Sequence, residues 1–156
     1  MIAVEIRQIK AFMQKLFLTE TFDRFLVSDV QITTFAEFRI DGRLHREYFP
    51  DDADQKNDAP FAPWSLLRPH CLNVIRGTRE PLSMRIVFRC PPDETAALLE
   101  EEAPSGAADG IDGLFMNCLF RDGSLLVTSG VSYTGFTADR SAEHAWDARL
   151  RALLAE

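Results

Sequence analysis

The chain has 156 residues, of which 46% are hydrophobic and 26% charged, and its formal net charge is −7. This length suits one domain with a single buried core, so we expect one domain over residues 1–156. The negative charge provides no field that would attract a polyanion. It therefore argues against nonspecific binding to nucleic acid or to an anionic membrane surface.

The three cysteines, Cys71, Cys90 and Cys118, are far apart and form no C-x-x-C pair. A sparse, odd set in apolar surroundings is typical of reduced, buried thiols. We therefore expect a cytoplasmic protein without disulfides and without a metal or other cofactor. The first ten residues are charged by position five and contain no apolar core, so we expect no signal peptide, and no membrane span is visible.

The first third of the chain predicts a strand, a helix and a region of strands. Residues 2–6 are predicted as a strand, and apolar residues at helical spacing predict a helix over 9–17. The alternating pattern of residues 25–49 predicts two or three strands. Within it, Asp41-Gly42 predicts the turn of a hairpin, because a tight turn of this type needs positive φ angles.

The next segment predicts a loop and then a helix. Residues 51–63 are polar and contain prolines, which indicates a surface loop, and its aspartates do not have the spacing of a calcium loop. Helical spacing returns from Trp64 and ends near Gly77. Pro69 leaves two alternatives: a helix kinked at Pro69, or a separate turn before a helix that Pro69 opens. We expect His70 to be a structural histidine close to the core.

The second half of the chain has the clearest patterns. Residues 82–90 alternate between apolar and polar side chains and predict a strand with one buried face. A helix is predicted over 93–102 and a loop over 103–112. Asp122-Gly123 predicts a second hairpin with arms 113–120 and 124–133, and a final helix is predicted over 141–154.

These elements predict an α+β fold, mainly an antiparallel sheet built from hairpins and packed by about four amphipathic helices. Their order is βαββ(β)α followed by βαββα, which raises the hypothesis of a structural pseudo-repeat. The order faintly resembles the strand–helix–strands unit of sliding-clamp subdomains. No clamp motif accompanies it, and a shared fold would not establish a shared function.

The segment SAEHAWD, 141–147, contains the side chains closest to a catalytic group. On a helical wheel Trp146 falls on the apolar stripe, whereas His144 lies on the opposite face with Asp147 and Arg151. One interpretation makes His144 and Asp147 candidate catalytic residues in an acid–base or anion site. The other is a solvated helix face, capped by Ser141 or Asp139 and stabilised by an Asp147–Arg151 pair.

Motifs of established chemistry are missing from the sequence. It contains no G-x-S-x-G elbow, no G-x-G-x-x-G, no P-loop and no H-E-x-x-H. Its three histidines fall in different predicted elements, so a histidine-rich metal site is not expected. These observations argue against an enzyme without excluding one.

Arginine dominates the basic residues, with fourteen Arg against three Lys. Arg85 and Arg89 share the polar face of one predicted strand, and Arg39 and Arg43 lie near the first predicted turn. If these strands are neighbours, the four guanidiniums form a candidate anion-binding patch. The alternative is that the many carboxylates of the surface neutralise them.

The predicted arm 113–120 is apolar on both faces, with Phe115 and Leu119 on the second face. Such an arm is either covered twice within the domain or used in a subunit contact. The leading hypothesis is therefore a non-catalytic cytoplasmic module that binds a protein partner or itself, for example as a homodimer. The alternative is a small-molecule or anion-binding protein, or an enzyme, that uses the face of His144, Asp147 and the nearby arginines.

Three blocks carry a family resemblance: ITTFAEFRIDGRL, WSLLRPHCLNVIRGTREPLSMRIVFR and GLFMNCLFRDGSLLVTSGVSYTGFTADRSAEHAWD. Together they resemble a family of short, uncharacterised bacterial proteins over essentially the whole chain. The resemblance implies a free-standing bacterial domain. It supplies no activity, cofactor or catalytic residue.

Overall fold

The computed structural model describes residues 1–49, 60–77, 79–102 and 110–155. The strands of this part of the chain are β1 (Ala3–Ile6), β2 (Leu26–Thr33), β3 (Glu37–Asp41), β4 (Ala62–Pro63), β5 (Ser83–Arg89), β6 (Ile111–Arg121) and β7 (Ser124–Tyr133). The α-helices are α1 (Ile9–Leu18), α2 (Trp64–Ile75), α3 (Pro92–Glu102) and α4 (Ser141–Ala155), with a 3₁₀ turn at Arg46–Tyr48. Most of the loop predicted over 51–63, and most of that predicted over 103–112, lies outside the described residues.

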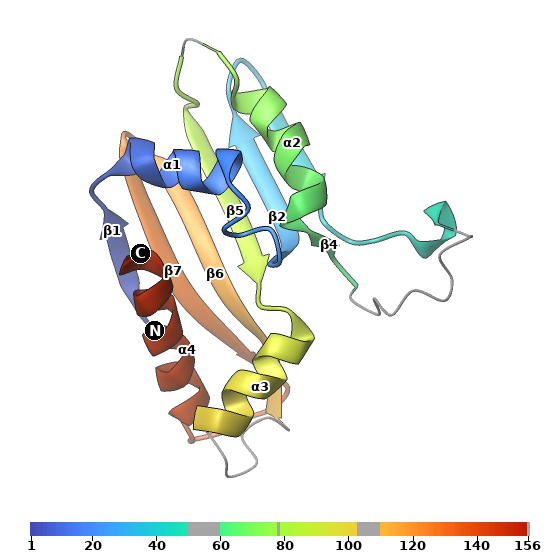
Figure 1. Cartoon of the computed structure of the whole chain (residues 1–156), viewed down its shortest axis with the longest axis vertical. Coiled ribbons are helices and arrows are strands. Elements are labelled where there is room, and N and C mark those ends of the chain that lie inside the picture. Colours follow the sequence, from blue (N-terminus) through green and yellow to red (C-terminus); the bar gives the residue numbers. More distant parts are fainter. Residues whose placement is uncertain (50–59, 78, 103–109, 156) are drawn as a thin grey trace.

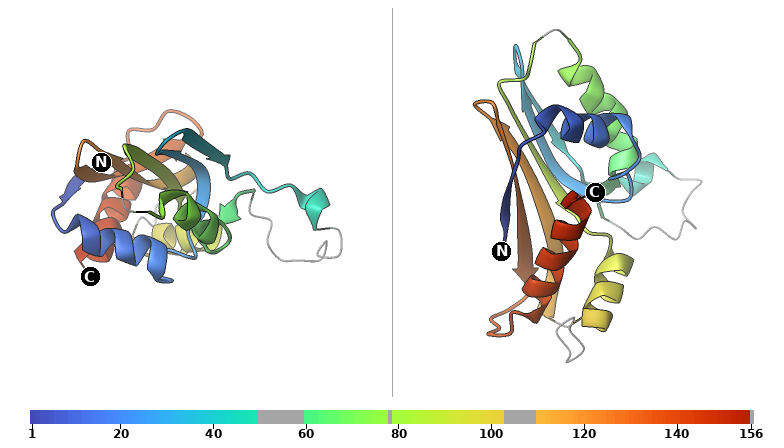
Figure 2. Two further views of the ribbon diagram at one scale, coloured as in Figure 1. Left: turned by 90° about the horizontal axis from the view of Figure 1, so that it is seen from above. Right: turned by 60° about the vertical axis from the view of Figure 1, so that its left-hand side comes forward.

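All strand pairs are antiparallel, and the sheet has the order β1-β7-β6-β5-β2-β3, with β4 paired to β2. The predicted α+β class is confirmed. The four helices lie on one face of the sheet and leave the other face open (Figures 1 and 2).

One row of paired residues shows why this face is covered. Its members are aliphatic or Cys, and they lie across the sheet in the order Val4, Val127, Cys118, Ile86, Val30 and Ile40. All six belong to the main core or pack against it. Because side chains alternate along a strand, the neighbouring residues point to the open face. The strand predicted over 82–90 has this alternation, with Met84, Ile86 and Phe88 fully buried.

Two tryptophans attach helices to the rest of the core. The Trp64 indole N–H, at the start of α2, donates to Leu16 O at 2.9 Å and so ties α2 to α1. The Trp146 indole N–H donates to Phe115 O at 2.7 Å and ties α4 to β6. Both side chains are at most 2% exposed. A buried indole needs such an acceptor, because an unpaired N–H in the core is costly.

The two alternatives for Pro69 are resolved in favour of one helix, because α2 runs from Trp64 to Ile75 with Pro69 inside it. Gly77 follows the C-terminal cap residue Arg76, as predicted. His70 is exposed, so its expected place close to the core is wrong.

The hairpin predicted at Asp122-Gly123 is confirmed. The two residues have φ angles of 51° and 76°, the left-handed pair that a tight β6–β7 turn requires. The turn predicted at Asp41-Gly42 is wrong, because β2 and β3 are joined through residues 34–36 and pair from Asp29↔Asp41 to Thr33↔Glu37.

Gly42 has a different physical role. It extends β3 alongside β2, where its N–H donates to Ser28 O at 3.1 Å. A Cβ at this position would lie 1.7 Å from Val27 O. The sequence therefore has glycine here because two backbones approach closely, and not because the chain turns.

The two halves share the predicted order of elements but not their positions in the sheet. In the second half β5 lies beside β6, whereas in the first half β1 is separated from β2 by three strands. The two halves are therefore not superposable units of this sheet. Among the described helices, none combines the length and the hydropathy that crossing a membrane requires.

We predict that Gly42→Ala lowers the free energy of unfolding by more than about 3 kcal/mol, because the new methyl group displaces β3 from β2. Gly123→Ala is the matched control. It has no atom within 4 Å of a new Cβ but a φ of +76°, so it should cost only about 1–2 kcal/mol. Urea denaturation measures both, and equal losses would contradict the close-approach role of Gly42.

Candidate functional site

Asp147 lies in a buried polar junction between α4, β7 and the start of the chain. Its side chain accepts a hydrogen bond from the Ser129 hydroxyl, and the same hydroxyl accepts from the Ile2 N–H at 2.9 Å. The amino group of Met1 lies 3.0 Å from Asp147 Oδ2. Asp147 is only 5% exposed, so the interpretation that it shares a solvated face with His144 is wrong.

The long-range pairing of β1 with β7 is the reason for this difference. It brings Ile2 and Ser129 beside α4, on a side of the helix that the local sequence marks as polar. The Asp147 carboxylate therefore has Ser129 and Met1 as partners, and the predicted Asp147–Arg151 pair is not observed among the described residues. This arrangement supports the packing of α4 and contains no histidine that could activate Ser129.

His144 is exposed on α4, whereas Asp147 is buried. The helix begins as predicted with the help of Asp139, whose carboxylate accepts from the Ser141 N–H at 2.9 Å. This hydrogen bond lowers the pKa of Asp139. Glu143 pairs with the Met1 amino group, and a hydrogen bond from that group lowers the Glu143 pKa. The candidate catalytic pair His144 and Asp147 is thus divided between surface and core.

The four arginines of the predicted anion patch lie in or next to β3 and β5, which are separated by β2. Arg39 and Arg85 lie in one row, separated by Gln31 of β2. The Arg39 guanidinium is 3.3 Å from Glu37 Oε1. Arg43 follows β3, where its backbone forms a bridge with Phe61. Anion binding at this patch stays a prediction.

Arg89 is held between two aromatic rings. Its guanidinium carbon lies 4.8 Å from the centre of the Phe61 ring and 4.7 Å from that of Phe115. Asp112 adds an acceptor, with Oδ2 at 3.8 Å. Such stacking holds the segment before β4 against the sheet. It also covers part of Phe115, which the sequence marks as an apolar residue on the second face of its strand.

The remainder of that second face is open. Leu119 is 38% exposed, whereas Leu114, Met116, Cys118 and Phe120 of the same strand are buried beneath the helices. The arm predicted as apolar on both faces is therefore covered on one face only within the described chain.

The outer edge of β3 has no partner strand in the part of the chain that the structure describes. The Thr34 N–H donates to Ala36 O and the Gly42 N–H to Ser28 O. Both pairs continue the β2–β3 register, in which the even-numbered residues are therefore the hydrogen-bonded pairs. In an antiparallel ladder hydrogen-bonded pairs alternate with non-bonded pairs. The backbone groups of Glu37, Arg39 and Asp41 therefore point outward, away from β2.

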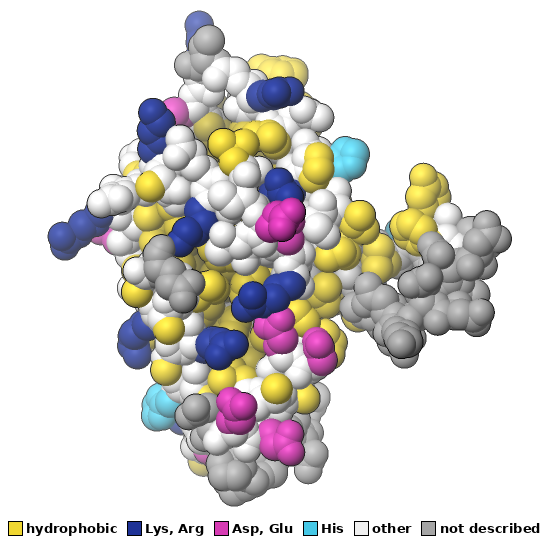
Figure 3. Space-filling view, in the orientation of Figure 1, with side chains coloured by type: hydrophobic (Ala, Val, Ile, Leu, Met, Phe, Trp, Pro, Cys, Tyr) yellow, Lys and Arg dark blue, Asp and Glu magenta, His cyan; other side chains and the backbone are white. Residues whose placement is uncertain are grey.

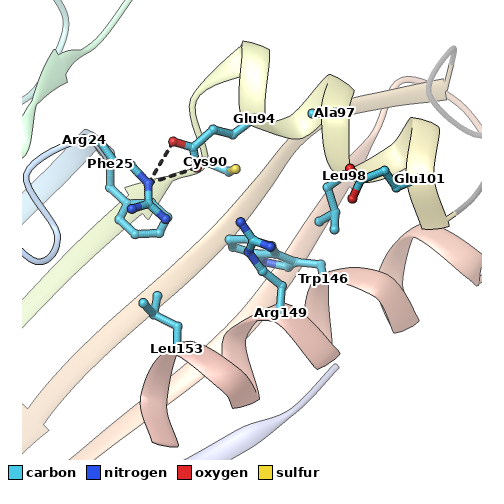
Figure 4. Close-up of a pocket in the computed structure, with 10 residues that line it drawn as sticks. All are labelled: Arg24, Phe25, Cys90, Glu94, Ala97, Leu98, Glu101, Trp146, Arg149 and Leu153. Atoms are coloured by element: carbon cyan, nitrogen blue, oxygen red, sulfur yellow. Dashed lines mark hydrogen bonds and ion pairs between the residues drawn. The ribbon is translucent and has the colours of Figure 1, made fainter. Parts of the chain in front are cut away.

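A pocket of about 190 Å³ lies between α3, α4 and the segment before β2 (Figure 4). Its apolar lining comes from residues far apart in the sequence, namely Phe25, Cys90, Ala97, Leu98, Trp146 and Leu153. Four charged residues surround this lining: Arg24, Glu94, Glu101 and Arg149. On this side of the molecule, hydrophobic side chains lie in a hollow with both basic and acidic side chains around it (Figure 3).

The two arginines at the pocket differ in whether they form an ion pair. Arg24 is paired with Glu94, with Nε 2.8 Å from Oε1. No ion pair of Arg149 is found among the described residues, and its side chain extends over Trp146 into the space between the helices (Figure 4). Burial raises the pKa of the Cys90 thiol to about 11, so this cysteine is protonated at neutral pH and is not a nucleophile there.

Within the described ranges, no group of three or more His, Cys, Asp or Glu side chains is placed to hold a metal ion. Neither His144 nor Asp147 is among the residues that line the pocket between α3 and α4. The sequence does not reveal the pocket between α3 and α4, because no local pattern relates Arg24 to Arg149.

One comparison with known proteins gives a match. The model of a family described as "Family of unknown function (DUF5721)" matches residues 15–156, nearly the whole chain. No curated protein and no solved structure matches the chain.

We predict that Ser129→Ala lowers the free energy of unfolding by about 1–3 kcal/mol, because it removes a partner from both Asp147 and the Ile2 N–H. Ser124→Ala, at the exposed start of the same strand, should stay within about 0.5 kcal/mol of the parent. Thermal unfolding monitored by circular dichroism compares the two. Similar effects at both positions would show that the junction contributes little to stability.

We predict an order of thiol reactivity. Cys71 and Cys118 are fully buried and burial raises the pKa of each to about 12, whereas Cys90 is 8% exposed. Iodoacetamide should therefore modify Cys90 first in the native protein and all three cysteines alike in denaturant. Peptide mass spectrometry resolves the three rates. Reaction of Cys118 as fast as Cys90 would contradict the core placement.

Proposed function

The chain belongs to DUF5721, a family of unknown function, and for it we propose a non-catalytic module that associates with a second copy of itself through β3. The observation that carries the proposal is the outer edge of β3, which has no partner strand within the described ranges and whose residues form a self-complementary sequence. A strand edge of this kind is a template for another strand. A two-fold axis would pair β3 with the same strand of the second copy, in antiparallel orientation.

The charges of β3 select one register for this pairing. Only outward-facing residues can exchange hydrogen bonds across the new edge, so odd-numbered residues must oppose one another. Placing Glu37 opposite Arg39 of the second copy gives two ion pairs by symmetry. The neighbouring registers place Arg39 opposite Arg39, or Glu37 opposite Glu37, and like charges in direct opposition are unfavourable.

The same register brings aromatic side chains together. Phe38 would face Phe38 of the second copy at the centre of the pairing, where opposing side chains are closest. Phe38 already packs edge-on against Phe35 at 5.7 Å, and Phe35 is 93% exposed at the tip of the β2–β3 turn. A phenylalanine this exposed, beside an open edge, supports a contact surface at this end of the sheet.

The free energy of such a contact is modest. Five residues of strand bury less area than a standard protein interface of roughly 1,600 Å², so we expect a reversible dimer with a dissociation constant between about 1 μM and about 1 mM. The open sheet face, with Leu119, offers further apolar area but has no comparable self-complementary charge pattern.

We also propose that the protein works in the cytoplasm. All three cysteines are free and buried. Unpaired thiols are usual in proteins of a reducing compartment, whereas proteins of oxidising compartments more often have their cysteines in disulfides.

Charge reversal tests the pairing. Glu37→Arg or Arg39→Glu should each raise the dimer dissociation constant at least about tenfold, because each places two like-charged pairs across the two-fold axis. The double variant Glu37→Arg with Arg39→Glu should restore it to within about threefold of the parent. Sedimentation equilibrium over a wide range of protein concentrations measures all four proteins.

Glu5→Arg is the matched control, since Glu5 lies exposed on β1 at the opposite edge of the sheet. It changes the charge by the same amount as Glu37→Arg and should leave association unchanged. A parent protein that stays monomeric at about 1 mM would refute the proposal, because that is the weakest affinity we assign to the contact. Failure of the double variant to restore association would refute the register.

A further inference from the structure

We propose that the pocket between α3 and α4 binds a small aromatic monocarboxylate, with its ring among the apolar side chains that line the pocket and its carboxylate on Arg149. This inference is independent of the β3 edge, because none of the residues that line the pocket belongs to β3.

The size of the pocket sets the size of the ligand. An apolar cavity of about 150 Å³ holds one benzene molecule. A pocket of about 190 Å³ therefore has room for one aromatic ring with a small substituent. Larger ligands, such as nucleotides or long acyl chains, would extend well beyond it.

The lining of the pocket matches an aromatic ring. Trp146 is one of the lining residues and is only 2% exposed, with its indole held in place by the hydrogen bond to Phe115 O. Phe25, Leu98 and Leu153 add apolar walls from three separate segments of the chain. Rings prefer such surroundings, since offset and edge contacts between aromatic side chains stabilise a bound ring. The indole is fixed before binding, which reduces the entropy lost on association.

The charges select a single carboxylate. Arg24 is already neutralised by Glu94, so Arg149 provides the cation that a ligand can engage, and a guanidinium binds a carboxylate with two parallel hydrogen bonds. Glu94 and Glu101 also line the pocket. Their charges would repel a phosphate or a dicarboxylate more strongly than a monocarboxylate. Burial raises the pKa of the Cys90 thiol, and the charges of Arg24 and Arg149 partly offset this effect because both lie near that side chain.

A matched series of three probes tests the inference on the full chain. Benzoate, benzamide and benzylamine have nearly the same shape but carry a negative charge, no charge and a positive charge. Benzoate should shift the nuclear magnetic resonance signal of the Trp146 indole N–H, with a dissociation constant of about 1 mM or tighter. It should also slow the alkylation of Cys90 while leaving Cys118 unaffected.

Arg149→Ala should weaken benzoate binding at least about tenfold, because the carboxylate loses its paired donor. Arg151→Ala, two residues further along α4 and exposed, is the control and should bind benzoate like the parent. Both variants alter exposed side chains, so both are expected to fold, which their circular dichroism spectra check.

Three results would overturn the inference. The first is the absence of any Trp146 shift at about 20 mM benzoate, well above the expected dissociation constant. The second is binding of benzamide or benzylamine at least as tight as that of benzoate. The third is equal benzoate affinity in Arg149→Ala and Arg151→Ala. Each of these three results can be measured whether or not the protein dimerises. The benzoate test and the test of the β3 edge can therefore succeed or fail independently.

Discussion

The burial of a single sheet face beneath four helices is the constraint on which the rest of the structure depends. It requires each strand to alternate between apolar and polar residues, and β5 meets this with Met84, Ile86 and Phe88 on the covered face. It also determines where the tryptophans can lie. Each indole is buried against the core and must find a carbonyl oxygen there, and these two hydrogen bonds fix the positions of α2 and α4.

One-sided burial also explains where functional surfaces can arise. Where α3 and α4 lie above the covered face they leave a gap between them, and this gap is the pocket. The sheet itself must end in two edges, since it does not close into a barrel. At one of these edges, β3 combines outward backbone groups with charged and aromatic side chains. The proposed contact and the proposed pocket are thus separate consequences of one architecture.

Much of the fold could be predicted from the sequence, because its elements follow local rules. Alternation marks β5, and Asp122-Gly123 marks a turn whose φ angles only a few residues tolerate. The same dipeptide at Asp41-Gly42 gives a wrong prediction. Glycine is needed there because the backbone lies close to Val27, and no local sequence pattern reveals that contact. Local rules also place Trp146 in the core correctly, since its apolar partners lie on the same helix.

The candidate sites could not be predicted, because they depend on contacts between distant segments. Asp147 has the spacing of a surface residue, and only the pairing of β1 with β7 explains its burial. The sequence shows the alternating charges of Glu37 and Arg39 but does not reveal that their strand lies at an edge. In the same way, Arg24, Cys90 and Arg149 become neighbours only when three elements pack together.

The pairing of β1 with β7 has a consequence for synthesis of the chain. Ile2 and Ser129 are 127 positions apart and yet share a buried hydrogen bond. At translation rates of about 5–20 residues per second, β1 would wait roughly 6–25 s for its partner strand to be made. Contacts over so long a stretch of chain also form slowly, since a large loop must close before they stabilise anything. β1 is therefore made long before its partner strand and is among the last strands to take its place in the sheet.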